Sequence, residues 1–113
     1  MSTMVKVKWS NVAENDLRRI IEYIARDNIA NAKKVFERII EKTADLYQLA
    51  DRGRIVPELQ DYGITLYREI VVAPWRIIYR PTDKEVHVLS VIDSRQNVED
   101  ILLNRLIKEL KIC

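Results

Sequence analysis

The spacing of apolar residues divides the first part of the chain into a strand and a helix. Val5, Val7 and Trp9 alternate with lysines, which is the two-residue period of a strand with one buried face. Ser10 is a suitable N-cap, and apolar residues then recur at helical spacing as far as Asp27. This pattern predicts a first strand followed directly by a helix.

A second helix is predicted after a short break at residues 28–31. Apolar residues again recur every three or four positions as far as Leu49, and Gly53 follows as a suitable C-terminal cap. The short break favours an antiparallel helix pair. Residues 54–63 are rich in turn-forming side chains and predict a connecting segment.

Three strands and a last helix are predicted in the C-terminal half. The strands cover residues 66–72, 75–80 and 86–92. Asn97 is a suitable N-cap for a final helix, whose apolar stripe runs from Val98 to Leu110.

A tight hairpin at Ala73-Pro74 predicts which strand residues share a face. Val72 then lies opposite Trp75, and the pairing continues to Arg68 opposite Tyr79 and Tyr67 opposite Arg80. One face carries Tyr67, Glu69, Arg76 and Arg80. The other, more apolar face is expected to pack against the helices and carries Arg68, Ile70, Val72, Trp75, Ile77 and Tyr79.

The predicted order of elements is strand, helix, helix, three strands, helix. This order is typical of an α+β fold with a small, mostly antiparallel, four-stranded sheet and an N-terminal helical hairpin on one face. We expect residues 1–113 to form a single domain. The second face of the sheet is expected to be open to a ligand.

Composition narrows the class of protein without identifying it. The chain has 19 basic and 17 acidic residues, an excess too small to imply nucleic-acid binding by itself. Its one cysteine is Cys113, so neither an intramolecular disulfide nor a zinc cluster is expected. No apolar run is long enough to cross a membrane. These features predict a cytoplasmic protein with no metal, no cofactor and no membrane partner.

The distribution of arginine carries more information than the net charge. Lysine is absent between Thr43 and Asp83, so the basic residues of the sheet region are all arginine. A guanidinium stays charged and presents a planar fork of donors that fits phosphate or carboxylate. The candidate target or phosphate contacts are therefore Arg54, Arg68, Arg76, Arg80 and Arg95.

Several short motifs, taken in order, resemble the RelE/ParE superfamily of toxins from type II toxin-antitoxin systems, often labelled plasmid stabilization proteins. They are residues 9–24, Gly53-Arg54-Ile55-Val56-Pro57-Glu58, Tyr67-Arg68-Glu69-Ile70, Trp75-Arg76-Ile77-Ile78-Tyr79-Arg80 and residues 86–95, which end in Asp93-Ser94-Arg95. The resemblance covers nearly the whole chain. It implies a small α+β toxin that arrests growth and is neutralised by a cognate antitoxin.

The resemblance implies one of two targets. ParE-like members poison DNA gyrase, whereas RelE-like members cleave messenger RNA in the ribosomal A site. Arg76 and Arg95 match cationic positions of the nucleases, but no tyrosine follows Tyr79, and the strand positions that carry lysines in the nucleases read Tyr67-Arg68-Glu69 here. The incomplete acid–base set favours the ParE-like function.

Two alternatives stay open. In a RelE-like endoribonuclease, Arg76 and Arg95 would stabilise phosphate, with Glu58 (or Glu69) and His87 in proton transfer. In the other alternative, the chain is an inactive module that only binds the antitoxin. The purely structural interpretation is an ion pair between Glu69 and Arg76 across the hairpin, and another between Arg54 and Glu58.

Overall fold

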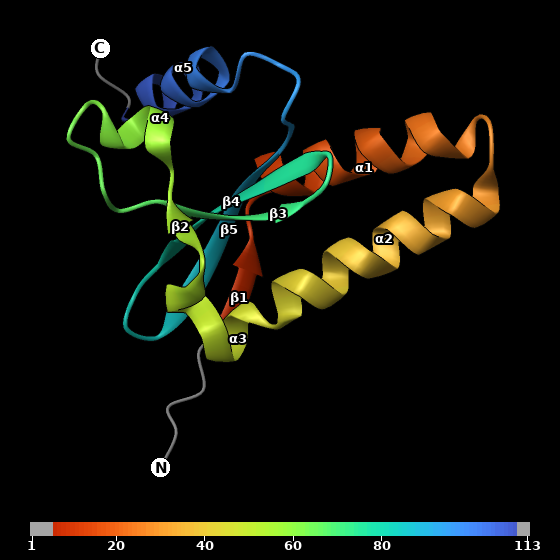
Figure 1. Ribbon diagram of the computed structural model, residues 1–113, viewed down its shortest axis with the longest axis horizontal. Helices are drawn as coiled ribbons and strands as arrows, with labels where there is room; N and C mark the ends of the chain where they lie inside the picture. Colours follow the sequence, from red (N-terminus) through yellow and green to blue (C-terminus); the bar gives the residue numbers. More distant parts are fainter. Residues whose placement is uncertain (1–5, 111–113) are drawn as a thin grey trace.

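The computed structural model describes residues 6–110 and shows one twisted sheet with helices on both faces (Figure 1). The sheet order is β1-β5-β4-β3-β2, in which β1 runs parallel to β5 and the other neighbours are antiparallel. The elements are β1 (Lys6–Trp9), α1 (Asn11–Ala25), α2 (Ile29–Ala44), α3 (Leu46–Leu49), a 3₁₀ turn (Ala50–Arg52), β2 (Arg54–Ile55), α4 (Pro57–Gln60), β3 (Arg68–Val72), β4 (Trp75–Pro81), β5 (Glu85–Asp93) and α5 (Val98–Leu110). The predicted α+β fold is confirmed.

The segment predicted as a connection contains two elements. Arg54 and Ile55 form β2, which pairs with β3, so the described sheet has five strands and the prediction of four was wrong. Pro57 then occupies the first position of α4. Proline has no backbone N–H, and at this position an N–H would have no hydrogen-bond partner within the helix. Two-residue strands and one-turn helices are too short to leave a periodic signal in the sequence.

The predicted N-caps Ser10 and Asn97 are confirmed, but the second helix is divided. The Ser10 hydroxyl accepts a hydrogen bond from the Ala13 N–H at 3.0 Å, and the Asn97 side chain accepts one from the Asp100 N–H at 3.1 Å. α2 ends at Ala44 rather than continuing to residue 49, and α3 and the 3₁₀ turn follow it.

Gly53 has a different role from the predicted helix cap. Its backbone is not left-handed; among the described glycines only Gly63 has a positive φ, at 77°. Instead, a β-carbon at Gly53 would overlap the hydroxyl of Tyr79 and lie 2.7 Å from the carbonyl oxygen of Glu69. Glycine is therefore needed for close approach of the chain to β3 and β4.

The predicted hairpin register is confirmed from Arg68 opposite Tyr79 to Val72 opposite Trp75. The pairing of β4 with β5 contains one irregularity, because Ile78 lies opposite Ser90 while Tyr79 lies opposite Val88. Leu89 is the extra residue of this β-bulge. The predicted residue Val5 lies outside the described residues, as does Cys113.

Both faces of the sheet are covered, which overturns the expectation of an open face. The more apolar face packs against α1 and α2 around Leu17, Ile39 and Ile77, as predicted. The opposite face packs against α4 and α5 around Leu59 and Leu102. Figure 1 shows these two helices together at one end of the sheet, away from the α1–α2 hairpin. Within the described residues, no helix is long and apolar enough to cross a membrane.

Candidate functional site

Four charged side chains form a continuous ion-pair network beneath α4. Arg76 donates from Nη1 and Nη2 to the two carboxylate oxygens of Glu58 at 2.6 Å each, and from Nε to Glu69 at 2.8 Å. Arg54 donates from Nε to the other oxygen of Glu69 at 2.6 Å. Glu69 is 2% exposed and Arg76 is 7% exposed. Glu69 and Arg76 thus lie between the sheet and α4, whereas the Arg54 side chain is 63% exposed at the edge of the sheet.

The pairing changes the acid–base behaviour of its members. Hydrogen bonds from Arg76 hold the pKa of Glu58 below its usual value, and the bonds to Glu58 and then Glu69 raise the pKa of Arg76. Both groups are therefore charged at neutral pH. A depressed pKa makes Glu58 a weaker base than an ordinary glutamate, which is unfavourable for proton abstraction.

The structural interpretation of Glu69 and Arg76 as an ion pair is confirmed. The predicted pairing of Arg54 with Glu58 was wrong, because Glu58 reaches Arg76 while Arg54 bonds Glu69 on the neighbouring strand. Contact between Arg76 and a target phosphate stays a prediction. It is disfavoured because the guanidinium is buried and its Nε, Nη1 and Nη2 atoms already have carboxylate partners.

Arg68 and Arg80 lie in different environments. Arg68 donates from Nη1 to the Gly53 carbonyl at 2.7 Å, so its guanidinium holds the chain that leads into β2. Arg80 is exposed, and within residues 6–110 its side chain makes no hydrogen bond or ion pair with another residue. Of these two predicted contacts, Arg80 is the one whose donors face solvent.

His87 lies on the open end of the sheet, between charged neighbours. Its Nε2 atom is 3.2 Å from Glu85, and it is placed opposite Lys8 on β1 and opposite Arg80 on β4. Lys8 donates to Glu85 at 2.6 Å and lowers the pKa of that carboxyl. His87 thus lies beside the half-exposed ion pair of Lys8 and Glu85.

Of the residues proposed for RNA cleavage, the structure brings Glu58 to Arg76 but leaves His87 distant from both. Arg76 lies opposite Ile92 of β5, five residues from His87 on the same strand. At about 3.3 Å per residue, that separation is roughly 16 Å along the strand. A general base and the cation that stabilises the phosphate must lie within a few ångströms of one reacting group, so His87 cannot act together with Arg76. Glu58 does lie beside Arg76, but its carboxylate is occupied by the guanidinium and its pKa is lowered, which is unfavourable for a general base.

Arg95 follows the end of β5 and remains exposed. Its side chain is 77% exposed and donates to Asp93 from Nε at 2.9 Å and from Nη2 at 2.6 Å. The side-chain and then the backbone hydrogen bonds of Arg95 lower the pKa of Asp93 to about 2. The guanidinium is therefore oriented by a permanently ionised carboxylate while most of its surface faces solvent.

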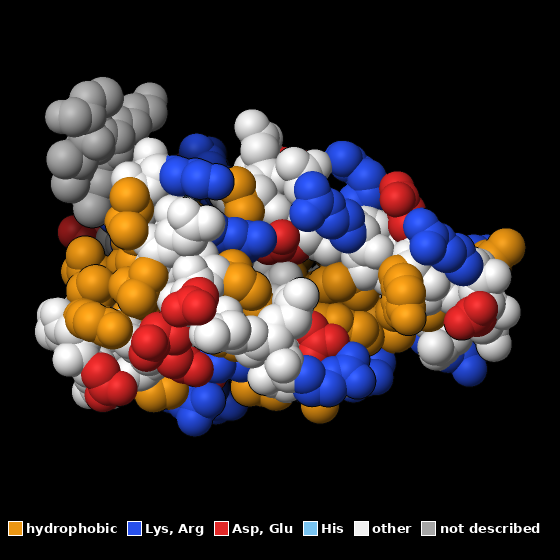
Figure 2. Space-filling view, turned by 90° about the horizontal axis from the view of Figure 1, so that it is seen from above, with side chains coloured by type: hydrophobic (Ala, Val, Ile, Leu, Met, Phe, Trp, Pro, Cys, Tyr) orange, Lys and Arg blue, Asp and Glu red, His pale blue; other side chains and the backbone are white. Residues whose placement is uncertain are grey.

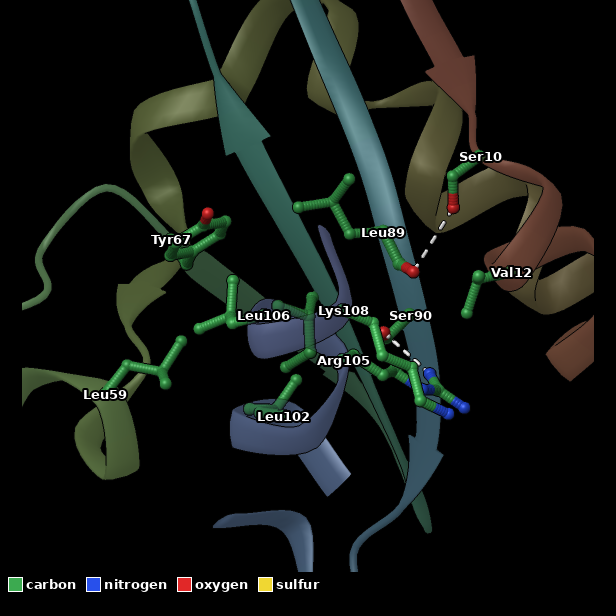
Figure 3. Close-up of a pocket in the computed structure, with 11 residues that line it drawn as sticks. Ser10, Val12, Leu59, Tyr67, Leu89, Ser90, Leu102, Arg105, Leu106 and Lys108 are labelled. Atoms are coloured by element: carbon green, nitrogen blue, oxygen red, sulfur yellow. Dashed lines mark hydrogen bonds between the residues drawn. The ribbon is translucent and has the colours of Figure 1, made fainter. Parts of the chain in front are cut away.

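An apolar groove lies beside the ion-pair network, between α4, α5 and the sheet (Figure 3). Its volume is about 350 Å³. In Figure 3, Leu59 of α4 and Leu102 and Leu106 of α5 face Tyr67 and Leu89 across the groove. Polar side chains line the side near Ser10, Ser90 and Arg105, where a dashed line marks the Arg105–Ser90 hydrogen bond.

A family model described as the ParE toxin of the type II toxin-antitoxin system parDE matches residues 7–98. The chain belongs to the ParE toxin family. A structure from the chromosomal ParDE toxin-antitoxin system of P. aeruginosa is similar, with 25% sequence identity and a TM-score of 0.66. The similarity covers 81% of this chain and 98% of that chain. No match was found among curated proteins. The predicted superfamily is confirmed, and with it the assignment as a toxin.

Sequence reasoning missed a second buried network, which holds α5 to this ParE-type fold. Asp16 of α1 is 8% exposed and accepts hydrogen bonds from Arg105 of α5 at 2.8 and 2.9 Å and from the Val91 N–H at 2.9 Å. Arg105 also donates to Ser90 at 2.8 Å. The available signal was the position of Asp16 inside the apolar stripe of the first helix, where a carboxylate requires a partner.

Among the described residues, no three histidine, cysteine or acidic side chains are grouped closely enough to hold a metal ion.

Proposed function

We propose that this ParE-family toxin arrests growth by binding and poisoning DNA gyrase, and that a cognate antitoxin neutralises it. The observation that carries the proposal is the family match over residues 7–98, together with the distance of His87 from Arg76 and the occupation of the Glu58 carboxylate by Arg76. Poisoning an enzyme by binding requires a stable surface and no acid–base pair of its own.

The electrostatics of the candidate site support a binding role rather than catalysis. Arg76 and Glu58 neutralise each other in a partly buried ion pair, so neither presents an unpaired charge to a substrate. Arg80 and Arg95 remain exposed and are the better candidates for target contact. Exposed arginines at an interface bind acidic or phosphate groups through several donors at once.

The antitoxin is proposed from the family and from the apolar groove. The ParDE system to which the similar structure belongs is a toxin-antitoxin system. The groove between α4, α5 and the sheet, lined by Leu59, Leu102 and Leu106, fits the apolar side chains of a partner segment.

The test is a plasmid supercoiling reaction with purified gyrase and ATP, run beside translation of a defined messenger RNA in a purified, DNA-free system. We expect linear plasmid to accumulate with increasing toxin while the message stays intact. Arg80→Ala and Arg95→Ala should weaken the effect on gyrase. Arg26→Ala, an exposed arginine just after α1, is the matched control and should behave as the wild type.

The other outcomes assign one of the alternatives. Cleavage of the message within codons, with normal supercoiling, would establish a RelE-like endoribonuclease and overturn the proposal. Intact plasmid topology and intact message together would identify an inactive, antitoxin-binding module.

A further inference from the structure

A cleft at the end of the sheet contains one of the two residues proposed to contact gyrase, Arg95, but not the other, Arg80. It lies between α1 and the segment that follows β5, and its volume is about 590 Å³. Cavities of roughly 300–1,000 Å³ are the size that accommodates small ligands in proteins. The lining side chains that bear on the argument are Arg19 and Tyr23 of α1, Asn31 of α2, Trp75 of β4, and Arg95 and Gln96.

Cations are in excess in this cleft. Three arginines line it, together with two carboxylates, Asp16 and Asp93. Asp16 is bound by Arg105, so both belong to the network that holds α5. Asp93 orients Arg95 but occupies only its Nε and Nη2 atoms. Arg19 is exposed, and its side chain makes no hydrogen bond or ion pair with another residue in the described chain, 6–110. Two arginines therefore offer donors to an anion.

Aromatic rings line the same cleft. Tyr23 is 71% exposed, which is unusual for a large ring that stabilises a fold only when it is buried. Trp75 lies at the start of β4 and is half-buried, with its other side packed on the core. The side chains of Asn31 and Gln96 add amide donors and acceptors to the lining.

Figure 2 shows the surface over α1, where Lys and Arg side chains recur beside exposed apolar groups. This combination differs from the groove beside α4, in which leucine is the commonest lining residue. An acidic peptide requires cations alone, whereas a nucleotide also gains from aromatic faces on which a base can stack.

From these observations we propose that the cleft binds an unpaired nucleotide of a single-stranded nucleic acid. Arg19 and Arg95 bind the backbone phosphates, and the base lies against Tyr23 and Trp75. The amides of Asn31 and Gln96 are placed to bond the base edge. This inference does not depend on gyrase as the target, because it concerns only how the chain contacts nucleic acid.

The test is fluorescence anisotropy of a labelled twelve-nucleotide oligothymidylate, titrated with wild-type protein at several salt concentrations. We expect Tyr23→Ala to weaken binding about tenfold, the usual effect of removing one stacking ring. We expect the Arg19→Ala/Arg95→Ala double variant to weaken binding further and to reduce the slope of log K against log salt by roughly 1.4, or about 0.7 for each lost phosphate contact.

The matched control is Arg18→Ala/Arg38→Ala, which removes the same charge outside the cleft. Arg18 is the neighbour of Arg19 but bonds Asn15 and lines a different groove. The control should bind like the wild type, and all variants should keep the wild-type melting temperature. If the control and the cleft double variant lost the same amount of affinity, the loss would come from net charge alone, and the proposal would be overturned.

Two further results would also reject it. One is the absence of wild-type binding at physiological salt. The other is competition by polyglutamate as strong as that by unlabelled oligothymidylate, which would assign the cleft to an acidic protein instead. An oligothymidylate complex that forms while gyrase activity is unaffected would support this inference and reject the gyrase function alone.

Discussion

Arg76 and Arg95 are both held by carboxylates, yet they lie in opposite environments. Arg76 is 7% exposed and is bound by Glu58 and Glu69 beneath α4, whereas the side chain of Arg95 is 77% exposed and is bound only by Asp93. Glu58 and Glu69 together leave almost no exposed surface on Arg76 for a partner. Asp93 fixes one edge of the Arg95 guanidinium and leaves the rest in water.

The comparison shows that burial, more than sequence motif, separates a structural arginine from one that can contact a ligand. A charge in a low-dielectric interior must be neutralised locally, so its carboxylates are part of the fold. An exposed ion pair contributes little to stability and can exchange partners easily. We therefore assign Arg76 to folding and propose Arg95 for recognition, and each of these roles leads to a measurement.

The largest expected effect is that of Arg76→Ala. Removing the arginine leaves Glu69 buried with Arg54 as its remaining ion-pair partner, and Glu58 loses its partner entirely. Breaking a buried ion pair in this way typically costs about 3–5 kcal/mol of unfolding free energy. Urea denaturation followed by circular dichroism measures the change.

A replacement by an apolar residue sharpens this test. Glu69 is the buried partner that Arg76→Ala leaves behind, and removing both charges is much less costly than removing one, so Glu69→Leu/Arg76→Met should recover part of the lost stability. If Arg76→Ala were as stable as the wild type but lost target binding, Arg76 would be a contact residue and the comparison would fail.

An intermediate effect is expected for Glu58→Gln as the pH is lowered. The pKa of Glu58 is depressed in the folded protein, chiefly by the hydrogen bonds of Arg76, so ionised Glu58 stabilises the fold above its unfolded pKa, near 4.5. That contribution is lost as the pH falls from about 4.5 through the lowered folded pKa. The wild type should therefore be more stable than Glu58→Gln at neutral pH, and this difference in stability should disappear in acid.

Thermal melts of the wild type and Glu58→Gln between neutral and acidic pH measure the difference in their stability. A constant difference at every pH would mean that the stability of this region does not depend on the charge of Glu58. Glu99→Gln is a suitable control, because Glu99 lies in the first turn of α5 and outside the network.

Much of the fold follows from sequence periodicity and caps. The hairpin register from Arg68 to Val72 was predictable because a two-residue turn at Ala73-Pro74 fixes which residues face each other. The short elements β2 and α4 were not, since they depend on contacts with β3 and α5 that are distant in the chain. Because α4 was missed, one sheet face was wrongly expected to be open.

The site was harder to predict than the fold for the same reason. The sequence correctly pointed to arginines in the sheet, but it cannot distinguish Arg76 from Arg80, which lie on the same face of one strand. A helix covers Arg76, and Arg80 lies beyond its end. The Asp16–Arg105 pair joins residues 89 positions apart, and no local sequence pattern predicts which distant residue pairs with Asp16.

The smallest expected effect on stability is that of Arg95→Ala, although its local effect is large. Because the guanidinium is exposed, the urea midpoint should stay within error of the wild type. The pKa of Asp93, which Arg95 lowers to about 2, should rise part of the way toward the usual value of 3.8 once the side-chain hydrogen bonds are lost, because the backbone N–H of residue 95 still donates to Asp93. Carbon-detected NMR titration of the Asp93 carboxyl measures this shift directly. A large loss of stability, with the pKa of Asp93 unchanged, would place Arg95 with Arg76 among the residues that hold the fold and would remove the distinction between them.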